Sequence, residues 1–361
     1  DTAEGATAET HSGEFPIVPG DPSASAVYAL MTSEDPDSIM PPADSGKQVT
    51  PEEIELIRQW IAEGAVYEGH WSYIAPKKSE TPEVSNEGWV NNGIDPYILA
   101  RLDKAGLTPS DEADRRTLIR RVSLDLTGLP PTPEVVEVFV NDQWAGAYDR
   151  VVEELLASPA YGERWAQLWL DLARYADTKG YEADRTRTIW KYRDWVIAAL
   201  NEDMPYTQFT IEQLAGDLLE NPTEAQIVAT AFHRNTMNND EGGTDAEEFR
   251  TAAVLDRVTT TMQVWMGTTM LCAQCHDHKY DPISTKEFYR FYDFFNQTAD
   301  NDNPDETPIY WHATDETKAV VEAWEKTSDE ARLERNRLDE LLKTATEEEK
   351  PDLEAQRKTA D

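Results

Sequence analysis

The chain has 361 residues, of which 70 are acidic and 33 are basic, so its formal net charge is −37. Such an acidic chain repels phosphate backbones, which argues against nucleic-acid binding. Mean hydropathy is −0.64, and no apolar run approaches the roughly 18 residues of a membrane span. Two cysteines cannot supply a disulfide framework for a chain of this length.

The first 74 residues predict a small, loop-rich part with one clear helix at residues 50–64. We expect Thr50 to be the N-cap of this helix, with Pro51 at the first helical position. Glu53 is placed for a capping box, and Gly64 is placed to end the helix. The chain opens without a methionine and closes inside a helical pattern. We therefore expect that it is a piece of a longer protein, with further domains missing at both ends.

Residues 75–93 are polar and predict a linker, and residues 94–298 then show mainly helical patterns without sustained alternation. The sequence thus predicts a mainly α fold. Residues 246–271 predict one long helix leading into the cysteines, and residues 284–297 predict an aromatic helix. Residues 315–361 are charged with a thin apolar seam, which indicates a helical hairpin, a coiled-coil arm or a solvated helix.

The only two cysteines lie in the segment "LCAQCHDHKYDP", where Cys272, Cys275 and His276 complete a C-x-x-C-H motif. Two thiols three residues apart can reach the two vinyl groups of a haem, and the adjacent imidazole can then bind the iron. The motif therefore predicts a covalent c-type haem, with His276 as the proximal iron ligand.

Three other kinds of site fit the same residues. A structural zinc ion takes four ligands, which Cys272, Cys275, His276 and His278 could supply, although closure from a single turn is awkward. A redox dithiol normally follows a strand in an α/β fold, and no such context is present. A disulfide between the two cysteines is also conceivable.

The segment "LCAQCHDHKYDPIS" closely resembles the haem-binding end of the planctomycete cytochrome C domain family known as DUF1549. The resemblance extends from about Ile94 to Asn296 through further matching stretches. These stretches are "IDPYILARLDKAGLTPSDEADRRTLIRRVSLDLTGLPPTPEVV", "YGERWAQLWLDLARYADTKGYEADR", "YRDWVIAALNEDMPYTQF", "QLAGDLL", "AFHRN" and "EEFRTAAVLDRV". The N-terminal stretches "FPIVPGDPSASAVYALMTSEDPDSIMPP" and "VTPEEIELIRQWIAEGA" resemble the end of the planctomycete-type cytochrome C domain that usually precedes it.

The resemblance implies a helical haem-binding domain at residues 94–298, preceded by a truncated cytochrome c-like domain at residues 1–74. It implies haem c (iron) as the cofactor, electron transfer as the function, and a periplasmic or otherwise exported location in a bacterium. A redox partner protein is then expected, and the negative charge favours a basic one. The preceding domain normally carries its own C-x-x-C-H motif, which we expect to lie before Asp1.

The resemblance also implies that Met40, in the "MPP" loop, is the sulfur ligand to the haem of that truncated domain. The alternative is a loop residue that covers apolar surface. For the iron bound by His276, the candidates for the opposite ligand are His233, His278, Met237, Met262, Met266 and Met270. His233 is the preferred one, because it ends an apolar helix and precedes a polar loop, while a core or capping histidine is the alternative.

Two other functions remain open at this point. If no residue lies opposite His276, the iron is open, and the expected function is that of a haem-dependent oxidoreductase, with polysaccharide use as one setting for it. If the cysteines bind zinc instead, the protein is a zinc-stabilised interaction module.

Overall fold

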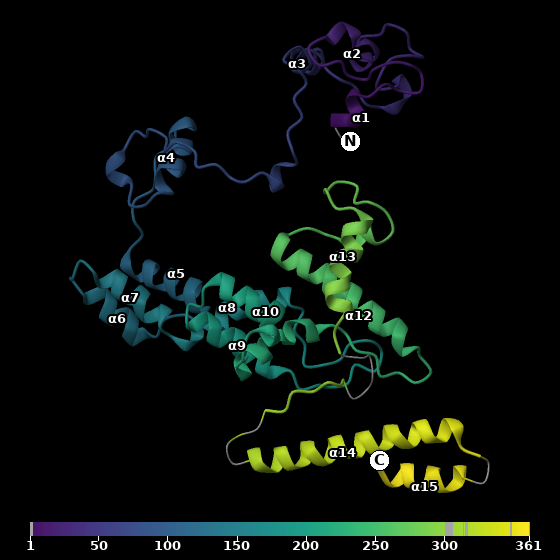
Figure 1. Cartoon of the computed structure of the whole chain (residues 1–361). Helices are drawn as coiled ribbons and strands as arrows, with labels where there is room; N and C mark the ends of the chain where they lie inside the picture. The colour runs from purple at the N-terminus through teal and green to yellow at the C-terminus, as the bar shows by residue number, and fades with distance from the viewer. Residues whose placement is uncertain (1–2, 300–305, 313, 315–316, 347–348, 361) are drawn as a thin grey trace. The chain divides into compact units, whose positions relative to one another are not determined.

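The computed structural model describes residues 3–299, 306–312, 314, 317–346 and 349–360 (Figure 1). The fold is mainly α, as the sequence predicts. Within the described residues there is no β-strand, and the only strand-like pairing is a single antiparallel bridge between Thr178 and Thr186. The chain divides into two compact units, Asp1–Asp111 and Glu112–Asp361, which are taken separately below.

The first unit is built from short helices around a small apolar core. Its α-helices are α1 (Ala3–Thr7), α2 (Ala26–Met31), α3 (Pro51–Ala62) and α4 (Asp95–Lys104). The core consists of buried Ile17, Ile61 and Ala65. Helix α3 confirms the predicted capping box, because Thr50 N donates to Glu53 at 2.8 Å and Glu53 N donates to Thr50 at 3.2 Å.

The segment between α3 and α4 includes the predicted linker. Residues 75–86 contain no helix, and a short 3₁₀ turn follows at Glu87–Trp89. Helix α4 belongs to the first compact unit, although the predicted haem-binding domain begins at residue 94. The expected domain limits therefore stay a prediction.

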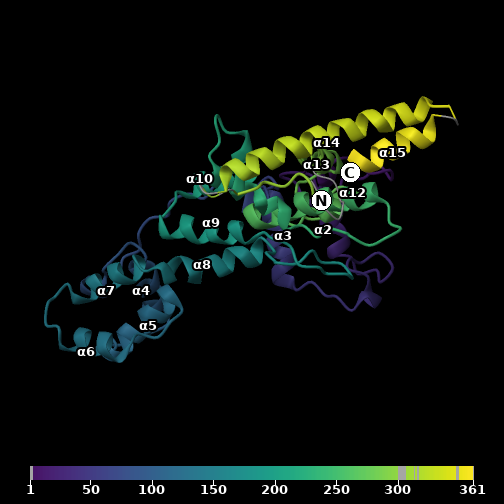
Figure 2. The ribbon, with the colours of Figure 1, turned by 90° about the horizontal axis from the view of Figure 1, so that it is seen from below.

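The second unit carries most of the helices. They are α5 (Arg115–Thr127), α6 (Pro133–Asn141), α7 (Ala147–Leu156), α8 (Pro159–Leu172), α9 (Trp190–Asn201), α10 (Tyr206–Ala215), α11 (Glu224–Ala229), α12 (Ala246–Thr261), α13 (Thr285–Asn296), α14 (Lys318–Thr344) and α15 (Lys350–Ala360). Helices α8 and α9 run side by side (Figure 2). They meet closely because Gly162 of α8 has no side chain: a Cβ there would come within 2.5 Å of the Ile197 carbonyl oxygen.

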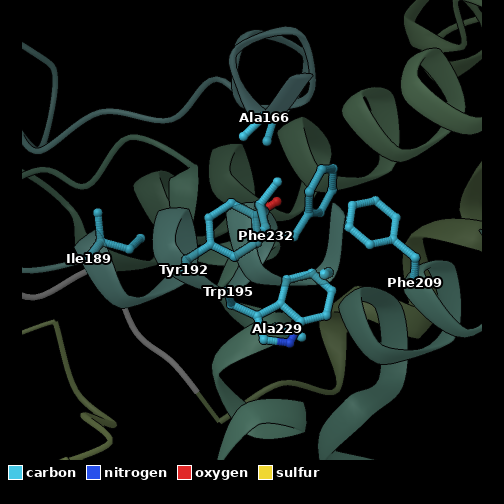
Figure 3. Close-up of a cluster of buried hydrophobic side chains, with 10 residues drawn as sticks. Ala166, Ile189, Tyr192, Trp195, Phe209, Ala229 and Phe232 are labelled. Atoms are coloured by element: carbon cyan, nitrogen blue, oxygen red, sulfur yellow. The ribbon is translucent and has the colours of Figure 1, made fainter. Parts of the chain in front are cut away.

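The main core lies where α8, α9 and α10 meet, and it is rich in aromatic rings (Figure 3). Trp169 contacts Phe209 edge-on at a centroid distance of 4.8 Å. The polar atoms of these rings are satisfied inside the core, since Trp169 Nε1 and Tyr192 Oη each donate to Gln213 Oε1 at 2.7 Å. Buried rings with paired polar groups make this region a fixed support for the segments that follow it.

The long helix predicted for residues 246–271 is wrong in its C-terminal part. Helix α12 ends at Thr261, a π-helical turn covers Met262–Met266, and Gly267 ends it in the left-handed region at φ 62°. A non-glycine residue would be strained there. A 3₁₀ turn, η8 (Leu271–Gln274), then carries the cysteine motif. Gly267 is thus the physical reason why the helix stops before Cys272.

The C-terminal segment forms a helical hairpin, one of the arrangements that its sequence predicts. Helices α14 and α15 pack against each other, and both views show them running alongside one another (Figures 1 and 2). Leu338 is buried, and Arg357 Nε donates to Asp339 across the hairpin at 2.5 Å. Within the described part of the chain, every helix is too short or too polar to traverse a bilayer.

Replacing Gly162 by alanine tests the close approach of α8 and α9. We expect Gly162→Ala to lower the free energy of unfolding by about 1–3 kcal/mol, because the new methyl group collides with backbone. Gly242→Ala is the matched control, since a Cβ at Gly242 meets nothing within 4 Å. Urea unfolding followed by circular dichroism measures both variants, and equal effects of the two would contradict the packing described here.

Candidate haem-attachment site

The cysteine motif sits on a short turn whose apolar side is buried. Ala273 N donates to the Met270 carbonyl at 2.9 Å, and Cys275 N donates to the Cys272 carbonyl at 3.4 Å. Ala273 and Met270 are buried in a cluster with Val258 of α12 and Phe288 of α13. Cys272 and Cys275 are exposed and unpaired. The burial of Ala273 therefore leaves both thiols accessible from solvent.

The imidazole of His276 is exposed, and its orientation is set by the backbone carbonyl of the next residue, Asp277. His276 Nδ1 lies 2.8 Å from the carbonyl oxygen of Asp277. A carbonyl oxygen only accepts hydrogen bonds, so the network assigns the proton to Nδ1. The lone pair of Nε2 is then available to a metal ion, which is the tautomer that a proximal ligand needs.

Asp277 joins this histidine to helix α13. Its Oδ1 accepts the backbone N–H of Thr285, the first residue of α13, at 2.8 Å. The same helix end has a capping box, in which Ser284 and Glu287 cap each other. The pKa of Glu287 is lowered, first by the backbone N–H of Ser284 and then by its hydroxyl. The turn after His276 is thus tied to a well-capped helix.

Tyr289 makes the second tie between α13 and the motif. Its hydroxyl donates to the carbonyl oxygen of Gln274, between the two cysteines, at 3.2 Å.

Apolar side chains are also exposed along the same stretch of chain. Met266, Leu271, Tyr280 and Tyr289 are all exposed. These side chains lie close to the motif in the sequence, and exposed apolar surface beside reactive residues is typical of a site that a ligand or a partner covers.

His278, the other histidine of the motif, is turned into its own loop, and its side chain is only 5% exposed. Its Nδ1 accepts the backbone N–H of Asp281 at 2.9 Å and that of Tyr280 at 3.3 Å. Its backbone N–H donates to the Ile283 carbonyl at 2.8 Å. His278 therefore shapes the loop between His276 and α13.

His233 lies at the other end of α13. Its ring contacts Phe232 and Phe295 at centroid distances of 5.2 and 4.9 Å. Phe295 is near the last residue of α13, whereas Tyr289 of its first half touches the cysteine turn. Six helical residues separate them by about 9 Å along the axis. The structure thus places His233 and His276 at opposite ends of this helix.

The methionine candidates are spread over the chain. Met270 and Met262 pack in the cluster beside the cysteine turn, while Met266 and Met237 are exposed. Met40 is exposed in the first unit, where its backbone N–H donates to the Leu30 carbonyl at 3.1 Å. Among the described residues, no three or more His, Cys, Asp or Glu side chains gather closely enough to hold a metal ion.

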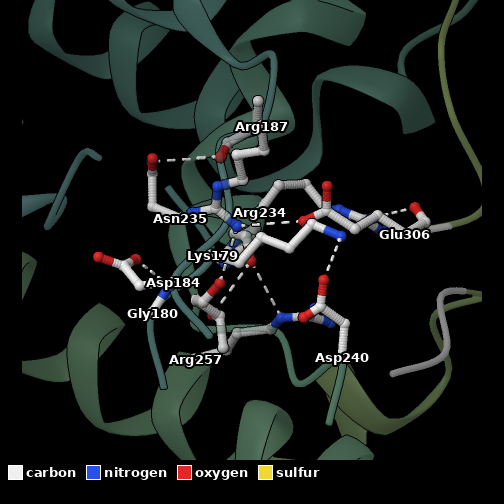
Figure 4. Close-up of polar contacts among 12 residues, drawn as sticks. Lys179, Gly180, Asp184, Arg187, Arg234, Asn235, Asp240, Arg257 and Glu306 are labelled. Carbon is white, nitrogen blue, oxygen red and sulfur yellow. Dashed lines mark hydrogen bonds and ion pairs between the residues drawn. The ribbon is translucent and has the colours of Figure 1, made fainter. Parts of the chain in front are cut away.

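A network of basic and acidic side chains holds the segment of His233 in place (Figure 4). Lys179 Nζ lies 3.4 Å from Asp240, and Arg187 Nη1 lies 3.5 Å from Glu306. Arg257 Nε donates to the backbone carbonyl of His233 at 3.1 Å. Arg257 of α12 thus holds the backbone of His233 directly, and the two ion pairs join further segments of the same network.

Comparison with known protein families gives two matches. Residues 93–300, more than half of the chain, match the family described as a protein of unknown function (DUF1549). The chain belongs to the DUF1549 family. Residues 1–44 match the family described as planctomycete cytochrome C. No curated protein and no solved structure matches the chain. The two matches confirm the resemblance seen in the sequence.

Sequence reasoning missed two residues of this DUF1549 domain that support the motif. The Asp277 carbonyl contacts the ring of His276, and the Tyr289 hydroxyl donates to the carbonyl of Gln274. The capping signal at Ser284 could have indicated that α13 begins just after the motif, and hence that Asp277 lies near its first N–H groups. No local signal marks Tyr289, because its contact depends on how the turn folds back onto α13.

The accessibility of the thiols can be tested on DUF1549 protein made in a cytoplasm that attaches no haem. We expect iodoacetamide to modify both Cys272 and Cys275 in the folded protein without added reductant, because both side chains are exposed. Intact mass spectrometry counts the adducts, and Cys272→Ser and Cys275→Ser should each lose one. Labelling that appears only after reduction or unfolding would contradict the exposed, unpaired thiols.

Proposed function

We propose that this DUF1549 chain is a c-type cytochrome in which Cys272 and Cys275 hold a haem as thioethers and His276 binds its iron. The observation that carries the proposal is the orientation of His276. Its Nδ1 is engaged by the Asp277 carbonyl at 2.8 Å, directly after two exposed thiols. When bound, the haem supplies an Fe(III)/Fe(II) couple that carries one electron.

The surroundings of the motif suit such a group. Residues three apart on a 3₁₀ turn fall on the same side, and η8 is a 3₁₀ turn closed by the Cys275 N–H. Exposed Leu271, Tyr280 and Tyr289 offer apolar surface that a porphyrin would cover. The Asp277 carbonyl would make the His276 imidazole a stronger electron donor, as second partners of metal-bound histidines do.

The remaining features of the proposed cytochrome follow from the family and from charge. The haem-binding domain would cover residues 94–298, after the cytochrome c-like part at residues 1–74, in which Met40 would ligate a further haem. Haem c attachment implies an exported, periplasmic protein. The net charge of −37 would attract a basic redox partner and speed its encounter.

A second candidate function is supported by the position of His233. Because its ring packs against Phe295, at the opposite end of α13 from the motif, His233 would not bind the side of the iron away from His276. An open iron could bind a small molecule, which makes a haem-dependent oxidoreductase the alternative to pure electron transfer. The zinc-stabilised module has no such support, because no four-ligand set is assembled among the described residues.

A pyridine haemochrome spectrum tests the main proposal. Protein exported from a bacterium with a haem c attachment system should show a c-type band that survives acid–acetone extraction. The Cys272→Ser/Cys275→Ser double variant should lose that haem entirely, because no thioether can form. A His312→Leu variant is the control and should load haem like the parent protein. A haem-free parent, or a double variant that keeps covalent haem, would contradict the proposal.

Ligand binding to the loaded protein then separates the two candidate functions. If the iron is open opposite His276, added cyanide and CO should bind and change the Soret band. His233→Ala should then leave both the spectrum and the binding unchanged. A six-coordinate iron that refuses both ligands supports electron transfer alone, and the appearance of ligand binding only in His233→Ala would identify His233 as the opposite ligand.

A further inference from the structure

The loop between His276 and α13 is held by hydrogen bonds to the His278 ring, to the His278 backbone and to the Asp277 side chain. The side chain of His278 is turned into this loop and is only 5% exposed. We infer that His278 is a positioning residue for His276, which acts through the Asp277 backbone rather than by binding the iron. This inference rests on the proposed function.

The His278 ring acts as a hydrogen-bond acceptor. Two backbone N–H groups, those of Asp281 and Tyr280, point to its Nδ1 at 2.9 and 3.3 Å. Asp281 Oδ2 lies 3.3 Å from the same nitrogen. The carboxylate alone would favour a proton on Nδ1, but the shortest of these contacts is the Asp281 N–H at 2.9 Å, which needs a lone pair there, so the ring carries its proton on Nε2. The His278 side chain thus accepts the two backbone hydrogen bonds that close the turn at residues 278–281.

The loop is also closed on the rest of the domain. The His278 N–H donates to the Ile283 carbonyl at 2.8 Å, and the Ile283 side chain packs in the cluster with Ala273 and Phe288. The residue after Ile283 is Ser284, the N-cap of α13. The loop is therefore fixed at its base by packing and at its tip by the His278 ring.

The same loop is connected with the iron ligand through Asp277. Asp277 lies between the two histidines, and its carbonyl accepts from His276 Nδ1 at 2.8 Å while its carboxylate accepts from Thr285 N at 2.8 Å. The peptide group that presents this carbonyl is shared with His278, whose N–H belongs to it. An imidazole held by a well-aligned carbonyl donates more electron density to a metal. Holding His278 in place therefore holds the carbonyl that orients His276.

Two substitutions separate the acceptor from the rest of the ring. His278→Asn keeps an acceptor oxygen at the place of Nδ1, whereas His278→Leu keeps a similar volume without any acceptor. His312→Leu is the matched control, because His312 contacts Glu224 and none of the residues of this loop. All three are compared with the parent as exported, haem-loaded protein.

The haem content of the parent is measured first by its pyridine haemochrome, then hydrogen exchange and the midpoint potential are measured for each variant. In His278→Leu the amides of Tyr280 and Asp281 should exchange about tenfold faster, because they lose their acceptor. The midpoint potential should rise, because a less well-oriented His276 is a weaker donor to Fe(III). His278→Asn and His312→Leu should retain the exchange rates and the potential of the parent. Loss of haem loading in His278→Leu alone, with loading retained in His278→Asn, also supports the inference.

Three results would overturn the inference. A parent that carries no haem overturns the proposed function, and with it the inference. A loaded His278→Leu protein with the parent's potential overturns the inference and leaves the cytochrome proposal intact. Equal loss of haem loading in His278→Leu and His278→Asn also overturns it, because an acceptor at the Nδ1 position would then not be what matters.

Discussion

The burial of Ala273 is the constraint on which the cysteine–histidine site depends. Ala273 is buried in a cluster with Val258 of α12 and Phe288 of α13. A larger side chain at residue 273 would need extra space in this cluster, and extra atoms in a close-packed core shift the surrounding backbone. With Ala273 directed inward, its neighbours Cys272 and Cys275 are left on the solvent side.

The helices α12 and α13 in turn depend on the aromatic core of the second unit. Trp265 of the π-helical turn contacts Trp169 and Phe232 of that core, and its Nε1 donates to Thr210 at 3.0 Å. Met262, three residues earlier, packs in the cluster beside the cysteine turn. The π-helical turn thus joins the main core to the site, and π-turns inside helices are frequently found at functional positions.

Much of this architecture was readable from the sequence, because its signals are local. The capping box at Thr50 and Glu53, the helical spacing of apolar residues and the C-x-x-C-H motif each involve residues within one or two turns of chain. The break of the long helix after Thr261 was missed, since the apolar pattern continues through Met262–Met266 while Gly267 imposes the stop. The tie from Tyr289 to Gln274 and the network around Arg187 could not be predicted, because they join segments whose proximity exists only in the folded chain.

The central claim is that Cys272, Cys275 and His276 form the attachment site of a covalent haem. Peptide mass spectrometry of the exported protein tests it most directly, because it locates the modification on the chain. The peptide containing residues 272–276 should carry the mass of one haem, and both of its thiols should resist alkylation. A peptide recovered with two free thiols, or joined as a disulfide, in protein from a strain that loads other c-type cytochromes would contradict the claim.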